Sequence, residues 1–600
     1  MQGLPGKCRF ECEQAEPVEK KDTPNWYEPP APEGSYRSIL KLGKPDEVKH
    51  PSESWRRMVT DELGLDEEHF RERKHKEGDG IVAVDRPVGL SRTHIAALES
   101  IVGTENVAAD DYSRVKFSYG KLLDEAIELR REEVSNICDV VVHPRDKDDV
   151  RAIVAYCHEH RIPVIAFGGG SSVTSGLRPE RGGIVLALCT HMNKVLAINE
   201  RNQTAVVQPG LMTPDYEEAL NNARTRHGTA HNYTCGHFPQ SFPLCSAGGW
   251  VPTLATGQAS TYYGDAYDIV FSQEYVTPVG SFKTHDFPAT ATGPKVGDIM
   301  KGSEGAFGVL VEVTYKIFRY MPDTRQYFGF LFPSWEDAIT AGREVMQGEF
   351  GHPAVFRISD GEETETIFRM YGNDLVSRFV EMRGFKRMQR CLVLGTAEGD
   401  KHFAKHVKKM VKKIARQNGA MYVSGFLTKM WEKDRYSHPL LREDMMDFDI
   451  LIDTIETSVN WENIDSVYTA MRDFVKGHPN TMCLTHASHF YPQGTNLYCI
   501  FGLRYTSLEN FQALRAGIVD RIVAAGGSPS HHHGMGRLLA PWIEAHLGKE
   551  QMDVLRALKR HFDPHNIMNP GSLLGLELPE NQKRKPTQSL GVETKESPTL

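Results

Sequence analysis

Three consecutive glycines directly after a predicted strand constrain the fold of this chain more than any other feature. The segment that begins at Val140, VVVHPRDKDDVRAIVAYCHEHRIPVIAFGGG, predicts a strand, then a helix with apolar residues at helical spacing, then a second strand at 164–167. The run that follows, Gly168 to Val173, can bring backbone N–H groups close to a diphosphate. It lacks the last glycine of a Rossmann fingerprint and the Gly-Lys-Ser/Thr of a P-loop. We therefore predict a phosphate-binding loop of another type, with an ordinary glycine-rich turn as the alternative.

Two further runs of small residues lie in the same part of the chain. One is SAGGW at 246–250, followed by Thr253 to Gly257, and the other is GSEGAFG at 302–308. Alternating apolar and polar residues at 309–317 then predict a half-buried strand. Three such loops in one α+β domain, bounded here at 136–320, suit a long flat cofactor that contacts several loops.

The rest of the chain divides by composition. With 600 residues, of which 40% are apolar, the chain is long enough for several domains with real cores. Residues 1–50 are rich in Pro, Glu and Lys and predict an irregular arm, whereas 51–135 predict a helical region. Residues 321–576 mix helices and strands, which predicts an α+β cap domain, and 577–600 predict a disordered tail.

Charge, cysteine usage and targeting signals narrow the class of protein. The net charge of −9 and the pI near 6.3 argue against nucleic acid as a partner. Ten scattered cysteines without a CxxC pair favour a reducing compartment. The sequence shows no secretory signal, no apolar stretch of about 18 residues and no SKL-type ending, so we expect a cytoplasmic protein by default.

The order of four motifs resembles the FAD-binding flavoproteins of the vanillyl-alcohol-oxidase (PCMH) type. These motifs are PVIAFGGGSSV, CGHFPQSFPLCSAGGW, KGSEGAFGVL and DPHNIMNPG. The resemblance implies an α+β fold, with a two-part FAD-binding domain of that type and an α+β cap domain. No histidine occurs within GGGSSV, where covalent members attach the flavin, so we expect noncovalent FAD. The residues that the resemblance assigns to FAD are Phe167, Gly168, Gly169, Gly170, Ser171, Ser172, Val173, Gln240, Ser241, Phe242, Pro243, Leu244, Cys245, Ser246, Thr253, Leu254, Ala255, Thr256, Glu304, Gly305, Ala306, Phe307, Gly308, Val309 and Leu310.

The second half of the chain resembles the alkyldihydroxyacetonephosphate synthases, which are flavoenzymes of ether-lipid synthesis. The matching motifs are FRISDG at 356–361, LREDMM and IETSVNW within 441–461, SHFYPQGTNLYCIF, and GGSPSHHHGMG at 526–536. The resemblance implies a transferase that exchanges the acyl group of acyl-dihydroxyacetone phosphate for a long-chain fatty alcohol, with no net redox change. It also implies a homodimer, peripheral membrane contact and, on the eukaryotic precedent, a peroxisomal location.

The same resemblance assigns catalytic roles to Tyr498, His531, His532 and His533. The tyrosine would exchange protons at the substrate C1, and the histidines would handle the leaving carboxylate or the entering hydroxyl proton. From the residues alone, the tyrosine could be a core aromatic, and the histidines could form a solvated loop or bind a metal. Three consecutive side chains diverge and cannot easily close one tetrahedral site, so we predict no metal.

Two arginines are candidates for substrate binding, Arg442 for the phosphate and Arg357 near the flavin. Arg442 could equally form a surface ion pair, and Arg357 a structural one. His486 and His489 have the spacing H-x-x-H, but residues three apart on a regular strand face opposite sides, so we do not expect them to share a metal. The eukaryotic members carry Arg where this chain has His486.

Two other function classes fit parts of the sequence. An FAD-dependent 2-hydroxy-acid dehydrogenase or oxidase, of the D-lactate or glycolate type, would share the fold but pass electrons to an acceptor. Such enzymes usually carry a GHxGDGNxH-like stretch, and THASHFYPQG stands at the comparable place here. A flavin-free scaffold that retained the fold would be colourless when purified.

Overall fold

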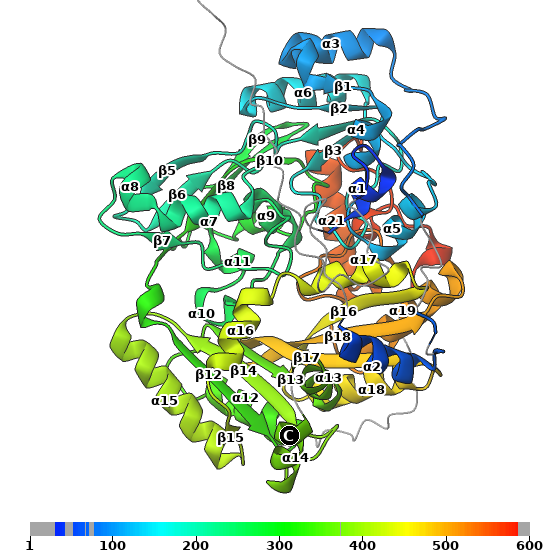
Figure 1. The fold of residues 1–600 in the computed structure, drawn as a ribbon. Coiled ribbons are helices and arrows are strands. Elements are labelled where there is room, and N and C mark those ends of the chain that lie inside the picture. The colour runs from blue at the N-terminus through cyan, green and yellow to red at the C-terminus, as the bar shows by residue number, and fades with distance from the viewer. Residues whose placement is uncertain (1–30, 43–51, 67, 71–76, 372–373, 586–600) are drawn as a thin grey trace, which may run out of the picture.

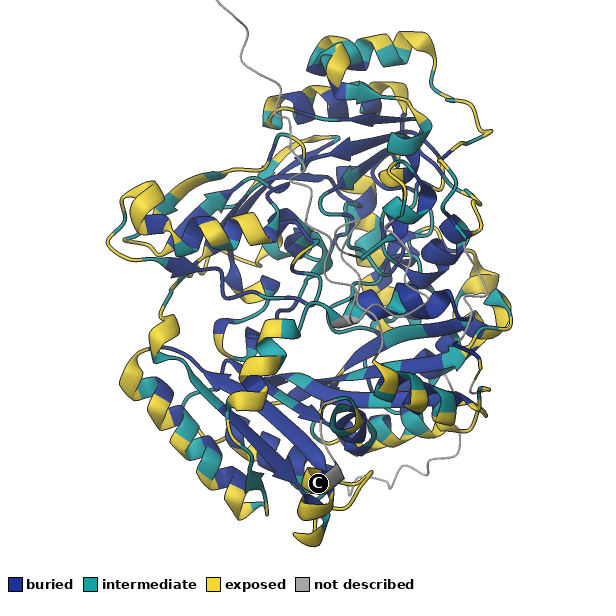
Figure 2. Ribbon diagram, viewed as in Figure 1, coloured by how far each residue is buried: buried dark blue, intermediate teal, exposed yellow. Residues whose placement is uncertain are grey.

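The computed structural model describes residues 31–42, 52–66, 68–70, 77–371 and 374–585, and the chain forms an upper and a lower α+β domain (Figure 1). The upper domain contains a four-stranded and a five-stranded sheet, and the lower domain is built on a seven-stranded sheet. Buried residues concentrate along the strands of these sheets and on the inner faces of the helices that cover them (Figure 2). The candidate site lies where the two domains meet.

The first sheet of the upper domain carries the glycine triplet. Its strand order is β1 (Val107–Ala108), β2 (Val140–Val142), β4 (Ile184–Ala187) and β3 (Val164–Phe167), with β2, β4 and β3 parallel. Helix α6 (Lys147–His160) connects β2 to β3, and the Asp146 carboxylate caps its N-terminus. Parallel strands connected by a helix are covered on both faces, which explains why every residue of β2 and β4 is buried.

The second sheet of the upper domain is antiparallel. Its order is β5 (Val195–Asn199), β6 (Thr204–Val207), β10 (Val309–Lys316), β8 (Val270–Thr277) and β9 (Gly280–Lys283). Helices α7 (Thr213–Asn221) and α8 (Ala223–His227) follow β6, and Gly228 ends α8 at a φ of 69°. The short strands β7 (Tyr233–Thr234) and β11 (Phe318–Arg319) pair with each other, and the short helices α9 (Trp250–Thr253), α10 (Ser260–Tyr263) and α11 (Ala266–Ile269) follow β7.

The lower domain is a seven-stranded antiparallel sheet. Its order is β15 (Met421–Tyr422), β12 (Gln326–Phe332), β14 (Cys391–Ala397), β13 (Val355–Ser359), β17 (Thr481–Tyr491), β18 (Gly494–Arg504) and β16 (Ile450–Asn460). Four helices bury apolar residues in one core with Phe328 and Phe330 of β12; they are α12 (Trp335–Met346), α15 (Lys401–Gln417), α18 (Ile464–Lys476) and α19 (Leu508–Ala524). The opposite face is contacted by α2 (Glu53–Leu63), α13 (Gly361–Tyr371), α14 (Asp374–Met382), α16 (Phe426–Asp434) and α17 (Leu441–Met446).

The N-terminal prediction needs one correction. Residues 36–40 of the predicted irregular arm form helix α1 (Tyr36–Leu40), which is capped by Ser35 and anchored by an Arg37–Asp447 ion pair of 3.0 Å. Most of the remaining arm lies outside the described residues. Within 51–135 the structure has the helices α2, α3 (Arg92–Val102), α4 (Asp111–Lys116) and α5 (Leu123–Arg130), together with strand β1.

The C-terminal part of the predicted cap, within 321–576, returns to the upper domain. Helices α20 (Ala540–Leu547) and α21 (Lys549–Phe562) place apolar side chains in the core of the five-stranded sheet, and Met568 bridges to β3. The predicted disordered tail is also partly wrong, because Lys583 pairs with Glu544 at 2.9 Å and residues 580–582 form a short 3₁₀ helix. Residues 586–600 lie outside the described residues.

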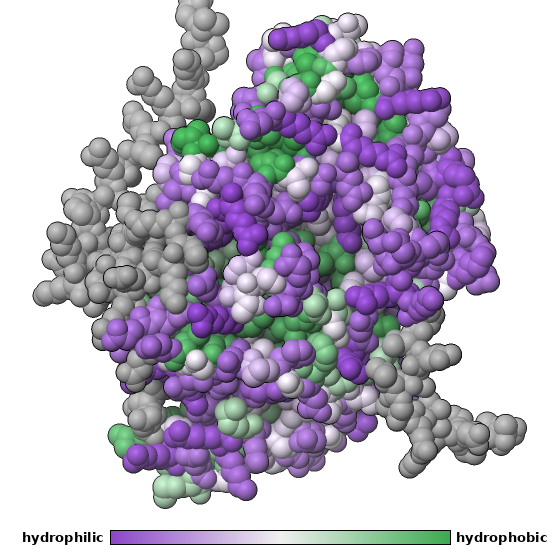
Figure 3. All heavy atoms as spheres, turned by 90° about the vertical axis from the view of Figure 1, so that its right-hand side faces the viewer, coloured by the Kyte–Doolittle hydropathy of each residue, from purple (hydrophilic) through white to green (hydrophobic). Residues whose placement is uncertain are grey.

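One face of the molecule, that on the right-hand side of Figure 1, is mainly polar. Seen from the right-hand side of Figure 1, hydrophilic residues dominate and hydrophobic residues form separate patches (Figure 3). Among the described helices, none combines the length and the apolar character that a membrane span requires.

Candidate active site

One cavity of about 830 Å³ joins the loops of the upper domain to the sheet of the lower domain. All three predicted glycine-containing loops contribute to its wall, together with residues of β16, β17 and β18. The predicted FAD residues that line the cavity are Gly168, Gly169, Gly170, Ser171, Ser172, Val173, Gln240, Ser241, Pro243, Leu244, Cys245, Ser246, Thr253, Ala255, Thr256, Glu304, Gly305, Gly308 and Leu310. The structure thus brings three distant segments of sequence to one ligand-sized space.

Six residues assigned to FAD do not line this cavity. Five of them are buried apolar residues: Phe167, Phe242, Ala306, Phe307 and Val309 pack in the hydrophobic cores behind the loops. The sixth, Leu254, ends helix α9 with a φ of 50° and packs against Gly302. These residues lie behind the loops and support them. In each motif, neighbouring residues line the cavity instead.

The glycine triplet lets two loops pack directly on each other. A Cβ atom on Gly169 would overlap the carbonyl oxygen of Leu244 and lie 2.8 Å from Cys245 Cα, and one on Gly168 would overlap the Ser246 hydroxyl. Gly170 has a φ of 70°, which side chains rarely tolerate. The loops after β3 and before α9 therefore form one continuous wall, which fits an extended ligand such as FAD.

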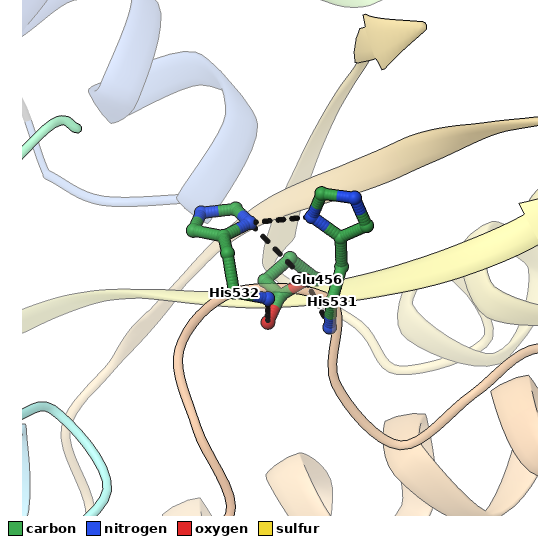
Figure 4. A group of neighbouring side chains, drawn as sticks. All are labelled: Glu456, His531 and His532. Carbon is green, nitrogen blue, oxygen red and sulfur yellow. Dashed lines mark hydrogen bonds and ion pairs between the residues drawn. The ribbon is translucent and has the colours of Figure 1, made fainter. Parts of the chain in front are cut away.

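The three consecutive histidines are held by a single buried carboxylate, Glu456 of β16. Figure 4 shows this carboxylate with His531 and His532. Its oxygens accept hydrogen bonds from the backbone N–H groups of His531 (2.7 Å), His532 (3.1 Å) and His533 (3.0 Å). They also accept from the Ser530 hydroxyl (2.7 Å) and the Asn496 amide (3.0 Å). Burial opposes ionisation of Glu456, but the neighbouring His533 and these donors hold its pKa below the usual value.

Glu456, His531 and His532 come close enough to resemble a metal site, with one ligand atom from each within 4.8 Å of the others. Hydrogen bonds already explain this geometry. The carboxylate has five donors, His531 Nδ1 lies 3.1 Å from His532 Nδ1, and His531 Nε2 lies 2.9 Å from the Tyr491 hydroxyl. Burial and the neighbouring imidazoles hold the pKa values of His531 and His532 well below the ordinary value, so both rings are neutral. The arrangement is that of a proton-handling network.

Tyr498 of β18 lies between two imidazole rings at the cavity wall. Its ring stacks on His486 with centroids 4.8 Å apart and on His532 with centroids 6.0 Å apart. Burial, together with the carboxylates of Glu456 and Asp453, raises the pKa of Tyr498 to about 12. The phenol is therefore protonated at neutral pH and can donate a proton to a ligand.

His486 and His489 do not face opposite sides, which corrects the expectation from their spacing. Both line the cavity, because β17 carries a bulge between Ser488 and Tyr491 and His489 has a φ of 52°. The bulge is fixed from the upper domain, where the Gly257 carbonyl lies 2.9 Å from His489 Nδ1. Burial lowers the pKa of His489 to about 4, so this ring is also neutral.

Arg357 of β13 reaches the same cavity. Its guanidinium lies 2.6 Å from the Glu363 carboxylate and 3.0 Å from His486. Arg357 therefore forms the structural ion pair that the sequence left open as an alternative, and this pair lies beside the cavity. Although burial opposes ionisation, Arg357 and His486 strongly lower the pKa of Glu363. His486 therefore lies in a charged cluster with Arg357 and Glu363.

Arg442 of α17 is half-buried, and among the described residues it forms no ion pair. Its Nη1 donates to the Lys121 carbonyl at 2.8 Å, while its Nε and Nη2 atoms are buried and have no hydrogen-bond partner in the described part of the chain. The side chain lines the cavity beside Lys121, whose pKa burial lowers to about 8. Two buried N–H donors of a cation are costly unless a ligand accepts from them, and a phosphate is a suitable acceptor.

Glu456 and the structural role of Glu304 could not be predicted from the sequence. Glu304 was assigned to FAD, but its carboxylate accepts from the backbone N–H groups of Met535 (2.7 Å) and Gly536 (2.9 Å). Burial raises the pKa of Glu304 to about 7. This residue thus ties a flavin-domain loop to the histidine loop. The sequence signal for this role of Glu304 is that an acidic residue stands inside a glycine-rich run.

Replacing Glu456 by Gln tests its positioning role. The amide group of Gln would face N–H and O–H donors in place of one carboxylate oxygen, which leaves buried donors unpaired at a cost of about 1–3 kcal/mol. We expect kcat to fall roughly tenfold or more, with FAD content unchanged because the flavin loops lie in the other domain. The exposed Glu462→Gln is the matched control. A wild-type kcat in Glu456→Gln would contradict the role.

Comparisons with known proteins agree with this geometry. Residues 138–285 match the family model described as FAD binding domain, and residues 321–573 match that of FAD linked oxidases, C-terminal domain. The alkyldihydroxyacetonephosphate synthase of Dictyostelium discoideum is 29% identical, covering 82% of each chain, and that of Trypanosoma brucei brucei is 28% identical, covering 84% of each. The glycolate oxidase subunit GlcD of Bacillus subtilis is 25% identical, covering 79% of this chain and 95% of its own.

A solved structure of an alkyldihydroxyacetonephosphate synthase superposes with a TM-score of 0.75 at 26% identity, covering 89% of this chain and 99% of its own. A 4-ethylphenol oxidase from Gulosibacter chungangensis, at 17% identity and a TM-score of 0.59, shares the fold. These matches confirm the predicted fold class and the prediction of FAD as the cofactor.

Proposed function

We propose that this chain, which belongs to the flavoproteins that join an FAD binding domain to the C-terminal domain of FAD linked oxidases, is an alkyldihydroxyacetonephosphate synthase. Among those flavoproteins it resembles these synthases, and the proposed reaction is theirs. It exchanges the acyl group of acyl-dihydroxyacetone phosphate for a long-chain fatty alcohol. The products are alkyl-dihydroxyacetone phosphate and a free fatty acid, so the reaction needs no external electron acceptor.

One observation carries this proposal: a half-buried arginine, two of whose buried donors have no partner among the described residues, shares a cavity with the flavin loops and with an acid/base cluster. Arg442 binds the phosphate of the substrate and thereby orients its C1 carbon toward Tyr498 and the histidine loop. When bound, FAD supplies the nucleophilic and redox chemistry at that carbon.

The protein's own groups handle the protons. Tyr498, protonated at neutral pH, donates a proton to the substrate at C1. The neutral imidazole of His532 lies next to it and accepts the hydroxyl proton of the entering alcohol. Glu456 holds the histidine loop in place, and its negative charge stabilises the imidazolium that forms. Closure of the lower domain over the flavin loops keeps water from competing with the alcohol.

The quaternary structure and the cellular location are also proposals. A homodimer and peripheral membrane contact rest on the resemblance to the synthases. A peroxisomal location rests on the eukaryotic precedent among the synthases.

An assay with and without an electron acceptor tests the function. Supplied with acyl-dihydroxyacetone phosphate and hexadecanol, the FAD-loaded enzyme should form the ether product at the same rate in both arms. Oxidation of D-lactate or glycolate that depends on the acceptor, without any ether formed, would contradict the proposal and favour a 2-hydroxy-acid dehydrogenase.

Arg442→Ala should separate phosphate binding from chemistry. The variant loses hydrogen bonds from a charged group, worth about 1.5–3 kcal/mol, so KM for the phosphate substrate should rise at least about tenfold. The exposed Arg504→Ala serves as the matched control. An unchanged KM in Arg442→Ala would show that the phosphate binds elsewhere.

A further inference from the structure

The proposed reaction leaves one proton over in each turnover. A new bond joins the alcohol oxygen to C1 of the substrate, and the bond from C1 to the acyl oxygen breaks, with its electron pair going to the carboxylate. The fatty acid that leaves is ionised at neutral pH, since carboxyl groups of this kind have a pKa of about 4. The hydroxyl proton of the alcohol must therefore reach the solvent, although closure of the lower domain keeps water from the cavity.

Two residues behind His532 lead away from the cavity. His532 lines the cavity wall, whereas His531 and Tyr491 do not. His531 Nδ1 lies 3.1 Å from His532 Nδ1, and His531 Nε2 lies 2.9 Å from the Tyr491 hydroxyl. Tyr491 is partly exposed, so its exposed surface faces solvent outside the cavity. A continuous chain of hydrogen bonds thus joins the cavity wall to the surface.

Glu456 sets the hydrogen positions along this chain. Its Oε2 lies 3.5 Å from His532 Nδ1 (Figure 4), and an ionised carboxylate favours a hydrogen on the ring nitrogen that it faces. His532 Nδ1 then donates to His531 Nδ1, so His531 carries its hydrogen on Nε2 and donates it to the Tyr491 oxygen. In this arrangement His532 Nε2 keeps a free lone pair, and the Tyr491 hydroxyl can donate its hydrogen outward.

The outer end of the chain lies near two carboxylates. Burial raises the pKa of Tyr491 well above the ordinary value, the carboxylates of Asp265, Asp268 and Glu456 raise it further, and the Thr256 hydroxyl opposes them. The phenol therefore stays protonated, and it can pass a proton on by accepting one from His531 while it donates its own. Asp268 is exposed, and its negative charge favours a proton at this part of the surface.

Two other imidazoles of the cluster lack such a connection. His489 Nδ1 lies 2.9 Å from the Gly257 carbonyl oxygen and 3.2 Å from the hydroxyl of Ser260, which is buried. His533 Nδ1 lies 3.8 Å from the buried carboxylate of Glu456. Within the part of the chain that the structure describes, neither imidazole is hydrogen-bonded to a partly exposed side chain. The route through His531 and Tyr491 is therefore the one that the hydrogen bonds favour.

We propose that His531 and Tyr491 form a proton relay, which carries to the solvent the proton that His532 takes from the alcohol. When His532 Nε2 accepts that proton, the Nδ1 proton of His532 moves to His531 Nδ1. The Nε2 proton of His531 moves to the Tyr491 oxygen, and the hydroxyl proton of Tyr491 leaves to water. Each group gains one proton and loses one, so no charge remains in the cluster. The relay rests on the proposed function, because it removes the proton of that reaction.

Tyr491→Phe, assayed with and without a small proton carrier, tests the relay. The FAD-loaded full-length enzyme is supplied with acyl-dihydroxyacetone phosphate and hexadecanol in dilute buffer. The kcat of the variant should fall about tenfold or more, because the last step of the relay is missing. Added imidazole can take the proton from His531 at this partly exposed position, so it should restore kcat toward the wild-type value. Wild type should not respond to imidazole.

Tyr327→Phe is the matched control. Tyr327 lies in the same sheet, and its hydroxyl donates to the Glu432 carboxylate at 2.8 Å, away from the histidines. This variant should keep the wild-type kcat with or without imidazole. A second variant, His531→Gln, should also have a low kcat. Combined with Tyr491→Phe it should lose no more than the slower single variant, because both residues belong to one path.

Two results would overturn the relay alone, provided that wild type forms the ether. An unchanged kcat in Tyr491→Phe would mean that the proton leaves by another route, such as the mouth of the cavity. A loss that imidazole does not restore, at normal FAD content, would mean that Tyr491 only holds His531 in place. Absence of ether formation by wild type would instead contradict the proposed function, and the relay with it.

Discussion

Gly169→Asp is expected to abolish FAD loading. The new Cβ would overlap the Leu244 carbonyl oxygen and lie 2.8 Å from Cys245 Cα, and both are backbone atoms that cannot move aside without separating the two loops. The added carboxylate would also bring negative charge to the wall predicted to hold the diphosphate. The purified variant should carry less than roughly a tenth of the wild-type flavin, measured from the ratio of flavin to protein absorbance.

Gly228→Asp is the matched control. That glycine ends α8 at a positive φ, where Asp is among the better-tolerated residues, and no heavy atom lies within 4 Å of its added Cβ. The control should keep its flavin. Normal flavin content in Gly169→Asp would show that the diphosphate is bound by another loop.

Tyr498→Phe is expected to lower kcat by about 100-fold or more, with little change in KM or FAD content. The substitution removes only the hydroxyl, and the ring keeps its stacking on His486 and His532. Because the pKa of this phenol is raised to about 12, the wild-type enzyme should show no loss of activity from tyrosine ionisation up to about pH 10.

Steady-state kinetics and a pH profile of both enzymes provide the measurement. Tyr262→Phe, in the upper domain and 37% exposed, is the control and should retain full activity. Full activity in Tyr498→Phe would mean that another group transfers the proton at C1.

The flavin side of the site could be predicted from the sequence because its determinants are local. Glycines that follow a strand specify a tight loop wherever the strand lies, so Gly168, Gly169 and Gly170 identified the cavity wall without knowledge of the fold. The same reasoning failed for Phe167 and Phe307, since a motif does not reveal which of its residues turn toward the core.

The substrate side depends on contacts between distant segments. Glu456 lies 75 residues before the first histidine that it holds, and nothing around it in the sequence marks it as their partner. The bulge that turns His489 into the cavity depends on Gly257 in the other domain, so strand alternation alone predicted the wrong face. The buried donors of Arg442, which have no partner among the described residues, became visible only once the helix was placed in the fold.

The stoichiometry of the reaction without oxygen or any added acceptor tests the central claim most directly. The FAD-loaded enzyme, acyl-dihydroxyacetone phosphate and hexadecanol are mixed anaerobically, and the ether product and the free fatty acid are quantified over many turnovers. If one cavity combines the flavin loops, Arg442 and the Tyr498–histidine cluster for acyl-to-alkyl exchange, the two products accumulate steadily in equal amounts. Formation that stops after about one product per flavin, or fatty acid released without ether, would contradict the account.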